Sequence, residues 1–244
     1  MNRKRVLQGE SALYKKVDRN WGRKIYKQDV SAEKIEKEKE ILTMLQPYAI
    51  AVPVKQFKYR EIVMRHADDT LHGFLAKKQG SSNFLFIVEH AVRQVRHHCM
   101  LMSALNVVHA DMSLRNIVVF YNYIGDDFPK VKLIDYGFGC RFNEEEEEAE
   151  DKDVIRHYLK THADESKTPL YKSYVKTFSD QFYRRPFKKD YEYDWIFFLY
   201  HLFIAFPILH PAKGICTFFP SNTIDSLQYY LETYYDDHWY DAPI

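Results

Sequence analysis

Alternating hydrophobic and polar residues dominate the first quarter of the chain. This alternation occurs within residues 6–27, around VPVKQF and around REIVM. A period of two is typical of strands with one buried face, and the intervening RNWG sequence indicates a turn. Residues 31–45 instead carry apolar residues at helical spacing behind Ser31, a suitable N-cap. We therefore expect residues 1–64 to form a small strand-rich lobe with one helix.

Helical periodicity is more common in residues 65–244. The segment ADDTLHGFLAKK leads into a short helix, and Asn83 precedes a long helix with apolar residues at helical spacing. Further helices are expected at residues 194–206 and 222–233. Strands are expected only around the polar loop near residue 111 and the segment VKLI. Together these patterns predict an α+β fold in which residues 65–244 form a second, mainly helical lobe of one domain.

Charge and cysteine content exclude several classes of protein. The chain has 35 Lys and Arg residues against 34 Asp and Glu residues, so no overall field favours nucleic acid or membrane surfaces. The three cysteines are widely spaced and indicate neither a metal site nor a disulfide framework. The N-terminus lacks the apolar core of a signal peptide, and the longest apolar run is too short to span a bilayer. We expect an intracellular protein, cytoplasmic or nuclear.

The segment VVHADMSLRNIVVF places polar residues between two strongly apolar runs. Its polar insert contains His109, Asp111 and Asn116, and nineteen positions after Asn116 the apolar strand VKLI leads into Asp135 and Gly137. A turn between buried strands needs none of these side chains. The pattern therefore indicates a functional site and not a simple turn.

The two motifs, HADMSLRN and DYG, resemble the H-x-D-x-x-x-x-N and D-F-G motifs of the protein-kinase superfamily. The combination H-A-D-x-S resembles the RIO-type atypical kinases in particular. This resemblance implies a bilobal protein-kinase-like fold with ATP and Mg²⁺, or Mn²⁺ in its place, in the cleft. By the same resemblance Asp111 accepts the hydrogen bond of the attacking hydroxyl, Asn116 and Asp135 bind the metal, and His109, Tyr136 and Gly137 provide structural support.

The helix at residues 31–45 gives an independent indication of a kinase-like site. Its buried stripe includes a carboxylate, Glu38, which requires a cationic partner because an isolated buried charge is costly. Kinases place such a glutamate opposite a strand lysine that holds the ATP phosphates. Lys24 and Lys27 are both candidates. We favour Lys27, because strand alternation then places Ile25 on the same cleft-facing side, against the adenine.

The remaining nucleotide contacts follow from the resemblance alone. Gly9 and Ser11 stand where kinases carry a glycine-rich loop over the phosphates, although only one glycine is present here. Met64 corresponds to the residue at the back of the adenine pocket, and His66 lies in the hinge that follows. Asp194 opens the helix at residues 194–206 and corresponds to the aspartate that anchors the catalytic loop. Asp153 is an alternative for that role.

The sequence also departs from the kinase pattern. Ala110 replaces the arginine that commonly precedes the catalytic aspartate, and an acidic run at residues 144–151 falls in the expected activation segment. Such a run is either a solvated loop or a means of attracting a basic protein substrate.

These observations favour an ATP- and Mg²⁺-dependent protein kinase that prefers Ser or Thr hydroxyls to Tyr. One alternative is a pseudokinase acting as a binding scaffold, which the thin glycine loop and Ala110 permit. Another is a small-molecule kinase of the aminoglycoside or choline type, which shares the H-x-D-x-x-x-x-N motif. Gly137 and the later segment YRRP favour protein substrates over small molecules.

Overall fold

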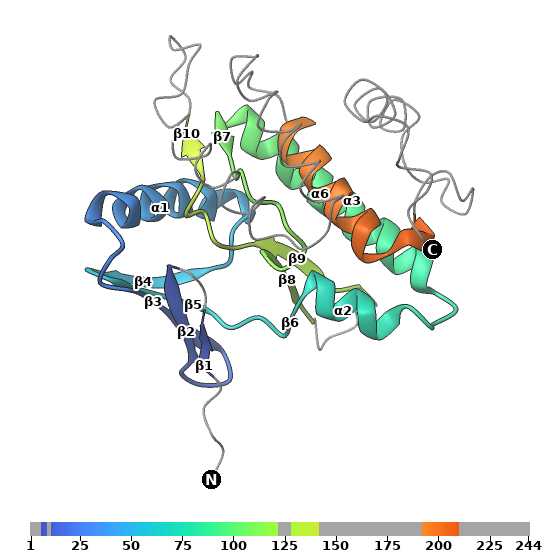
Figure 1. The fold of residues 1–244 in the computed structure, drawn as a ribbon, viewed down its shortest axis with the longest axis horizontal. Helices are drawn as coiled ribbons and strands as arrows, with labels where there is room; N and C mark the ends of the chain where they lie inside the picture. The colour runs from blue at the N-terminus through green and yellow to red at the C-terminus, as the bar shows by residue number, and fades with distance from the viewer. Residues whose placement is uncertain (1–5, 9–10, 122–127, 142–191, 210–244) are drawn as a thin grey trace.

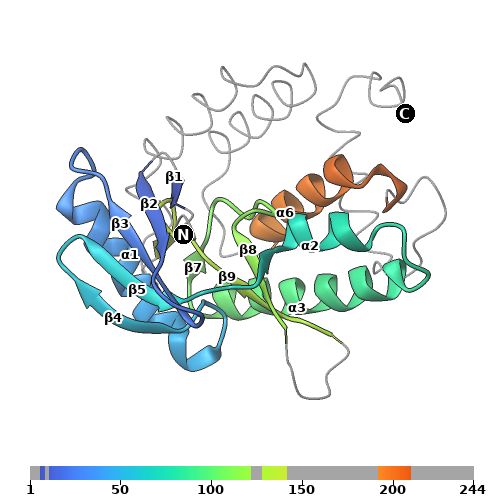
Figure 2. The same cartoon turned by 90° about the horizontal axis from the view of Figure 1, so that it is seen from below.

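The computed structural model describes residues 6–8, 11–121, 128–141 and 192–209. These residues form a mixed α+β structure with a main antiparallel sheet, two smaller sheets and a set of helices (Figures 1 and 2). Several sequence predictions lie outside the described residues: Gly9, the acidic run at 144–151, Asp153, the segment YRRP and the helix at 222–233.

Five antiparallel strands form the main sheet, which is called the sheet below, in the order β1-β2-β3-β5-β4. Their bounds are β1 Val6–Gln8, β2 Ala12–Lys16, β3 Trp21–Tyr26, β4 Val54–Lys58 and β5 Glu61–Arg65. The turn between β2 and β3 is closed by Asp18, whose Oδ1 accepts hydrogen bonds from the backbone amides of Asn20 at 2.7 Å and Trp21 at 2.9 Å. The strands expected from the alternating pattern are therefore confirmed.

Helix α1 (Ala32–Leu45) lies beside this sheet (Figure 1). Its N-cap is Ser31, whose Oγ accepts a hydrogen bond from the backbone amide of Lys34 at 3.2 Å, as expected from the sequence. A short 3-10 turn, η1 (Gln46–Tyr48), ends the helix. The chain then runs alongside β9, where Val52 N donates to Leu133 O at 3.1 Å and Leu133 N donates to Ile50 O at 3.0 Å. These bonds attach the sheet and α1 to the rest of the molecule.

The second part contains most of the helical residues. Its elements are β6 (Asp69–Thr70), α2 (Leu71–Lys78), α3 (Phe84–Ala104), β7 (Val107–Val108), β8 (Ile117–Phe120), β9 (Lys130–Leu133), β10 (Cys140–Arg141), α6 (Glu192–Ala205) and η2 (Pro207–Leu209). Strands β6, β8 and β9 form one small sheet, and β10 pairs with β7. Helices α3 and α6 contact one another (Figure 2).

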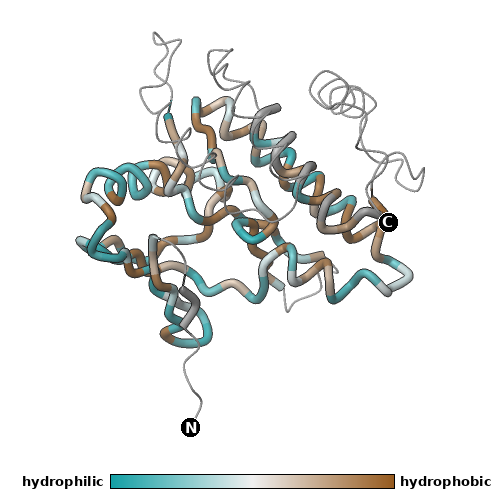
Figure 3. Tube along the Cα trace, in the orientation of Figure 1, coloured by the Kyte–Doolittle hydropathy of each residue, from teal (hydrophilic) through white to brown (hydrophobic). Residues whose placement is uncertain are grey.

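Helix α3 supplies much of the core of this second part. Hydrophobic residues predominate along it, whereas hydrophilic residues predominate on α1 (Figure 3). The buried residues recur at helical spacing and include Val88, Val95, Cys99 and Met102. No helix among the described residues is long and apolar enough to cross a bilayer.

Two methionines of α3 provide a test of this packing. Met102 is fully buried and Met100 is about half exposed. We expect Met102→Ala to lower the free energy of unfolding by about 2–5 kcal/mol, because it leaves a cavity, and Met100→Ala to change it by less than about 0.5 kcal/mol. Chemical denaturation measures both values. Equal losses for the two variants would contradict the orientation of α3.

Candidate functional site

A buried lysine connects three separate elements of the fold. The ammonium group of Lys24, in β3, lies 2.6 and 2.8 Å from the two carboxylate oxygens of Glu38, in α1. The same Nζ lies 2.8 Å from Oδ1 of Asp135, which follows β9. Tyr26 donates a hydrogen bond to Oε2 of Glu38 at 2.8 Å. We call Lys24, Tyr26, Glu38 and Asp135 the lysine cluster.

Strand alternation explains which lysine occupies this position. Gly22, Lys24 and Tyr26 are the buried residues of β3 and share its inner face, towards α1. Ile25 lies on the opposite face, and Lys27 follows the last residue of the strand. The structure thus corrects the predicted pairing: Glu38 has the cationic partner that its burial requires, but that partner is Lys24, and Ile25 does not share its face.

The charges of the cluster stabilise one another. Burial by itself lowers the pKa of Lys24, but the adjacent carboxylates of Asp135 and Glu38 outweigh this effect and raise it above its usual value. Burial likewise acts to raise the pKa of Asp135, yet the Lys24 ammonium holds it below its usual value. The Asp135 side chain is nevertheless 43% exposed, whereas that of Glu38 is 3% exposed. The cluster therefore carries a protonated amine and an accessible carboxylate.

The polar loop after β7 is held by hydrogen bonds of its own. Asn116 Nδ2 donates to Oδ2 of Asp111 at 2.6 Å and to the Asp111 carbonyl at 3.1 Å. The Asn116 carbonyl accepts a hydrogen bond from Ile134 N at 2.9 Å, next to Asp135 in the chain. This bond joins the polar loop to the segment that carries Asp135. The structure therefore places Asp111 and Asn116 beside the lysine cluster.

Helix α6 anchors the backbone of the same loop. Oδ2 of Asp194 accepts a hydrogen bond from His109 N at 2.7 Å, and Oδ1 accepts one from Ala110 N at 3.0 Å. This is the contact expected for Asp194. Burial raises the pKa of Asp194 to about 7, although both backbone donors act to lower it. Ala110 has a φ of 62° and Asp135 a φ of 65°, so both loops are held in the left-handed region.

His109 is fully buried beneath the loop. Its ring contacts Tyr136, with centroids 4.5 Å apart. Nε2 lies 2.9 Å from the carbonyl oxygen of Ile134, and Nδ1 accepts a hydrogen bond from Asp111 N at 3.2 Å. This arrangement requires a neutral imidazole with its proton on Nε2. Burial lowers the pKa of His109 to about 4, so the ring is uncharged at neutral pH and supports the loop.

The other predicted site residues lie in or beside the sheet, or next to Asp135. Met64 is buried and pairs with Gly22 across β3 and β5. His66 follows β5, and its Nδ1 is hydrogen-bonded to the hydroxyl of Tyr14. Ser11 precedes β2, and its carbonyl accepts a hydrogen bond from Lys27 N at 3.0 Å. Gly137 borders the cluster, since a Cβ there would lie 3.4 Å from Oδ1 of Asp135.

Sequence reasoning missed three features of the site. It did not identify Tyr26 as a donor to Glu38, the second carboxylate on Lys24, or the contact of Tyr14 with His66. Tyr26 could have been found, since it lies two residues from Lys24 and therefore on the same strand face. The other two contacts join distant parts of the chain and leave no local signal.

The donor set suits a magnesium ion that is bound together with a ligand. Among the described residues, no group of three or more His, Cys, Asp and Glu side chains could hold a metal ion. Asp135 offers an accessible carboxylate, and Asn116 offers Oδ1, because its Nδ2 is held by Asp111. Mg²⁺ commonly takes one or two protein oxygens and completes its shell with waters and phosphate oxygens. Asp135 and Asn116 fit that requirement.

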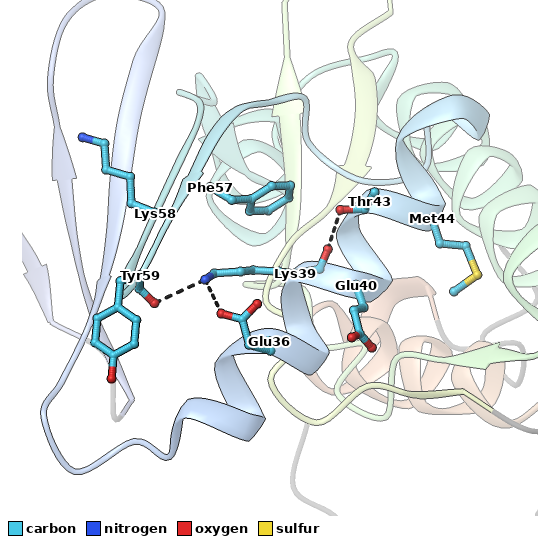
Figure 4. A pocket seen from close by; sticks show the side chains of 8 residues that line it. All are labelled: Glu36, Lys39, Glu40, Thr43, Met44, Phe57, Lys58 and Tyr59. Carbon is cyan, nitrogen blue, oxygen red and sulfur yellow. Dashed lines mark hydrogen bonds and ion pairs between the residues drawn. The ribbon is translucent and has the colours of Figure 1, made fainter.

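A separate hollow of about 570 Å³ lies between α1 and the turn that joins β4 to β5 (Figure 4). Within it, Lys39 Nζ lies 2.6 Å from Oε1 of Glu36 and 3.2 Å from the Tyr59 carbonyl. Thr43 donates to the Lys39 carbonyl at 2.8 Å. The hollow contains no residue of the lysine cluster, so it is not part of the candidate site.

Comparison of the chain with protein-family models and with curated proteins gave no match. The assignment of a function therefore depends on the residues and their geometry.

The two lysines can be separated by their effect on stability. We expect Lys24→Met to lower the free energy of unfolding by about 3–5 kcal/mol, because it leaves the buried Glu38 carboxylate without its cation. Lys27→Met, the matched control outside the cluster, should change it by less than about 0.5 kcal/mol. Urea denaturation measures both. A larger loss of stability for Lys27→Met than for Lys24→Met would show that Lys24 is not the partner of Glu38.

Because His109 is buried and neutral, we expect the free energy of unfolding to depend on pH. Because folding lowers the pKa of His109 from 6.5 to about 4, its contribution is complete above pH 6.5 and is lost as the pH falls towards 4. We expect His109→Gln, which keeps a donor for the Ile134 carbonyl, to flatten this decline by up to about 1.4 kcal/mol per pH unit.

The measurement is the free energy of unfolding of both proteins between pH 4 and pH 7. His98 and His201 also have pKa values lowered to about 4 by burial, but both proteins contain them, so the difference isolates His109. Parallel curves for the two proteins would refute the neutral state assigned to His109.

Proposed function

We propose that the protein is an ATP- and Mg²⁺-dependent protein kinase. The observation that carries this proposal is the lysine cluster: Lys24 is held by Glu38 of α1 and by Asp135, next to the hydrogen-bonded pair Asp111 and Asn116. Phosphoryl transfer requires an enzyme mainly to position groups and to neutralise phosphate charge. A fixed cation, metal ligands and a carboxylate for the acceptor are the parts needed for that chemistry.

The arrangement of the elements supports a bilobal fold of the protein-kinase type. The sheet and α1 would form the smaller lobe, and the remaining described elements the larger one. Lys24 and Glu38 come from the first of these parts, whereas Asp111, Asn116 and Asp135 come from the second. A nucleotide between them would contact both parts, as the resemblance of the two motifs to kinases implies.

Each residue then has a separate part in binding. Lys24 remains protonated at neutral pH and would exchange its contact with Asp135 for an oxygen of the triphosphate. Glu38 keeps the amine in place, and Tyr26 keeps Glu38 in place. Asp135 and Asn116 would hold Mg²⁺, which supplies neutralisation of phosphate charge when it is bound. Asp194 fixes the loop through the backbone amides of His109 and Ala110.

Asp111 would orient the acceptor. Its carboxylate is held by Asn116 and accepts a hydrogen bond from the incoming hydroxyl. The oxygen of that hydroxyl forms a bond to the γ-phosphorus while the bond from the γ-phosphorus to the β,γ-bridging oxygen breaks. The hydroxyl proton passes to Asp111, and ADP and the phosphoester leave. Holding both reactants in line lowers the barrier, because the enzyme has already fixed their relative orientation.

We propose a protein hydroxyl as the acceptor, with Ser or Thr ahead of Tyr. The loop HADMS supports this choice through its resemblance to the RIO-type kinases, and Gly137 supports protein over small-molecule acceptors. The acidic residues at 144–151 are either a solvated run or a means of attracting a basic substrate, which an assay with basic and acidic substrates distinguishes.

Radiolabelled ATP tests the proposal directly. We expect the wild-type protein with Mg²⁺ to phosphorylate itself, casein or a basic protein. Asp111→Asn should reduce the rate at least about 100-fold, because it removes the carboxylate that accepts the hydroxyl proton. Asp29→Asn, which changes an exposed carboxylate far along the chain from the loop, should retain the wild-type rate.

Other outcomes would select the alternatives. A wild-type protein that binds a partner but labels nothing would indicate a scaffold. Label on choline or an aminoglycoside, with none on any protein, would indicate a small-molecule kinase. Equal rates for wild type and Asp111→Asn would contradict the role given to Asp111.

A further inference from the structure

The phenol of Tyr14 covers the backbone of Gly22 on the inner face of the sheet. A Cβ atom added to Gly22 would overlap the Tyr14 hydroxyl and the adjoining ring carbons. Gly22 lies in β3 and Tyr14 in β2, where Tyr14 pairs with Lys24 and not with Gly22. The ring therefore leans diagonally across β3. It can do so because position 22 has no side chain.

The tip of the same ring is held by the segment that follows β5. The Tyr14 hydroxyl lies 2.9 Å from Nδ1 of His66, and the two rings are stacked with centroids 5.9 Å apart at an angle of 20°. Burial raises the pKa of Tyr14 to about 12, so the phenol is neutral at physiological pH. Burial is also the main cause that lowers the pKa of His66, so this hydrogen bond joins two neutral groups.

The position of the ring matters because of what lies at its two ends. Lys24 is directly opposite Tyr14, and Met64 is directly opposite Gly22. The phenol thus fills the inner face between the lysine cluster and His66. A ligand with phosphates at Lys24 that extends along the sheet towards His66 must cross Gly22. The phenol occupies that path.

We infer that Tyr14 is a built-in occupant of the nucleobase subsite, so that a nucleotide binds only when the phenol leaves Gly22 and His66. This inference rests on the proposed function, because it takes the phosphates to bind at Lys24. Tyr14 then sets the nucleotide affinity of the protein. The apparent dissociation constant equals the intrinsic one divided by the fraction of molecules in which the subsite is open.

Removing the ring should therefore tighten nucleotide binding. In the full chain with Mg²⁺, we expect Tyr14→Ala to bind ADP about tenfold more tightly than the wild type, the factor for one lost hydrogen bond and its ring contact. Tripolyphosphate with Mg²⁺ has no base, so its affinity should not change. Isothermal titration calorimetry measures the dissociation constants of both ligands.

Three further variants make the test specific. Tyr14→Phe keeps the ring but loses the His66 hydrogen bond, and should give a smaller gain in ADP affinity. Gly22→Ala expels the phenol through its new methyl group and should also tighten ADP binding. Tyr59→Ala removes a tyrosine that is 75% exposed at the β4–β5 turn, and should match the wild type.

Equal or weaker ADP binding by Tyr14→Ala would overturn the inference and leave the proposed function intact. Should that variant fail to fold, Tyr14→Phe decides: tighter ADP binding supports the inference, and unchanged binding overturns it. If neither ADP nor tripolyphosphate binds to any of the proteins, the proposed function fails and the inference falls with it.

Discussion

The structure depends on the ion pairs that compensate the buried positive charge of Lys24. Lys24 has a side chain that is only 10% exposed, and a lone ammonium in that position would be expensive. Its two carboxylate partners come from α1 and from the segment after β9, so the cost is met only when three elements meet at one point. The ion pairs thus specify where α1 lies on the sheet and where Asp135 lies beside it.

A second constraint fixes the loop that carries Asp111. Its backbone includes Ala110 in the left-handed region, a conformation that costs energy for a residue with a side chain. Two hydrogen bonds from the backbone to the buried Asp194 compensate for that cost. His109 fills the space below and bonds to the carbonyl of Ile134. These three hydrogen bonds hold the loop in the conformation that places Ala110 in the left-handed region.

Much of the described fold could be predicted from local patterns. The period of two located the strands, and the helical stripe of α1 identified Glu38 as a buried acid in need of a cation. The prediction that Lys27 pairs with Glu38 was wrong, because the alternation in RKIYK does not show which face of the strand is the inner one. Lys24 and Lys27 are three residues apart and therefore lie on opposite faces. Choosing Lys27 thus also placed Ile25 on the wrong face of the strand.

Long-range contacts were beyond such patterns. Tyr14 and His66 are separated by 52 positions, and nothing near either residue indicates the other. The exposure of Asp135 and its bond to Lys24 likewise arise only when the two parts of the molecule are brought together. These contacts decide the geometry of the candidate site, whereas the sequence motifs indicate only which residue types it contains.

Nucleotide-dependent metal binding tests the central claim most directly. Titration of Mn²⁺ followed by electron paramagnetic resonance, with and without ADP, measures whether the lysine cluster holds a metal–nucleotide complex. We expect ADP to create a Mn²⁺ site on the wild-type protein. Asp135→Asn should weaken that site by more than the roughly tenfold lost when an outer-shell partner is removed, and Asp29→Asn should leave it unchanged. Mn²⁺ binding that ignores ADP, or that survives Asp135→Asn intact, would contradict the account.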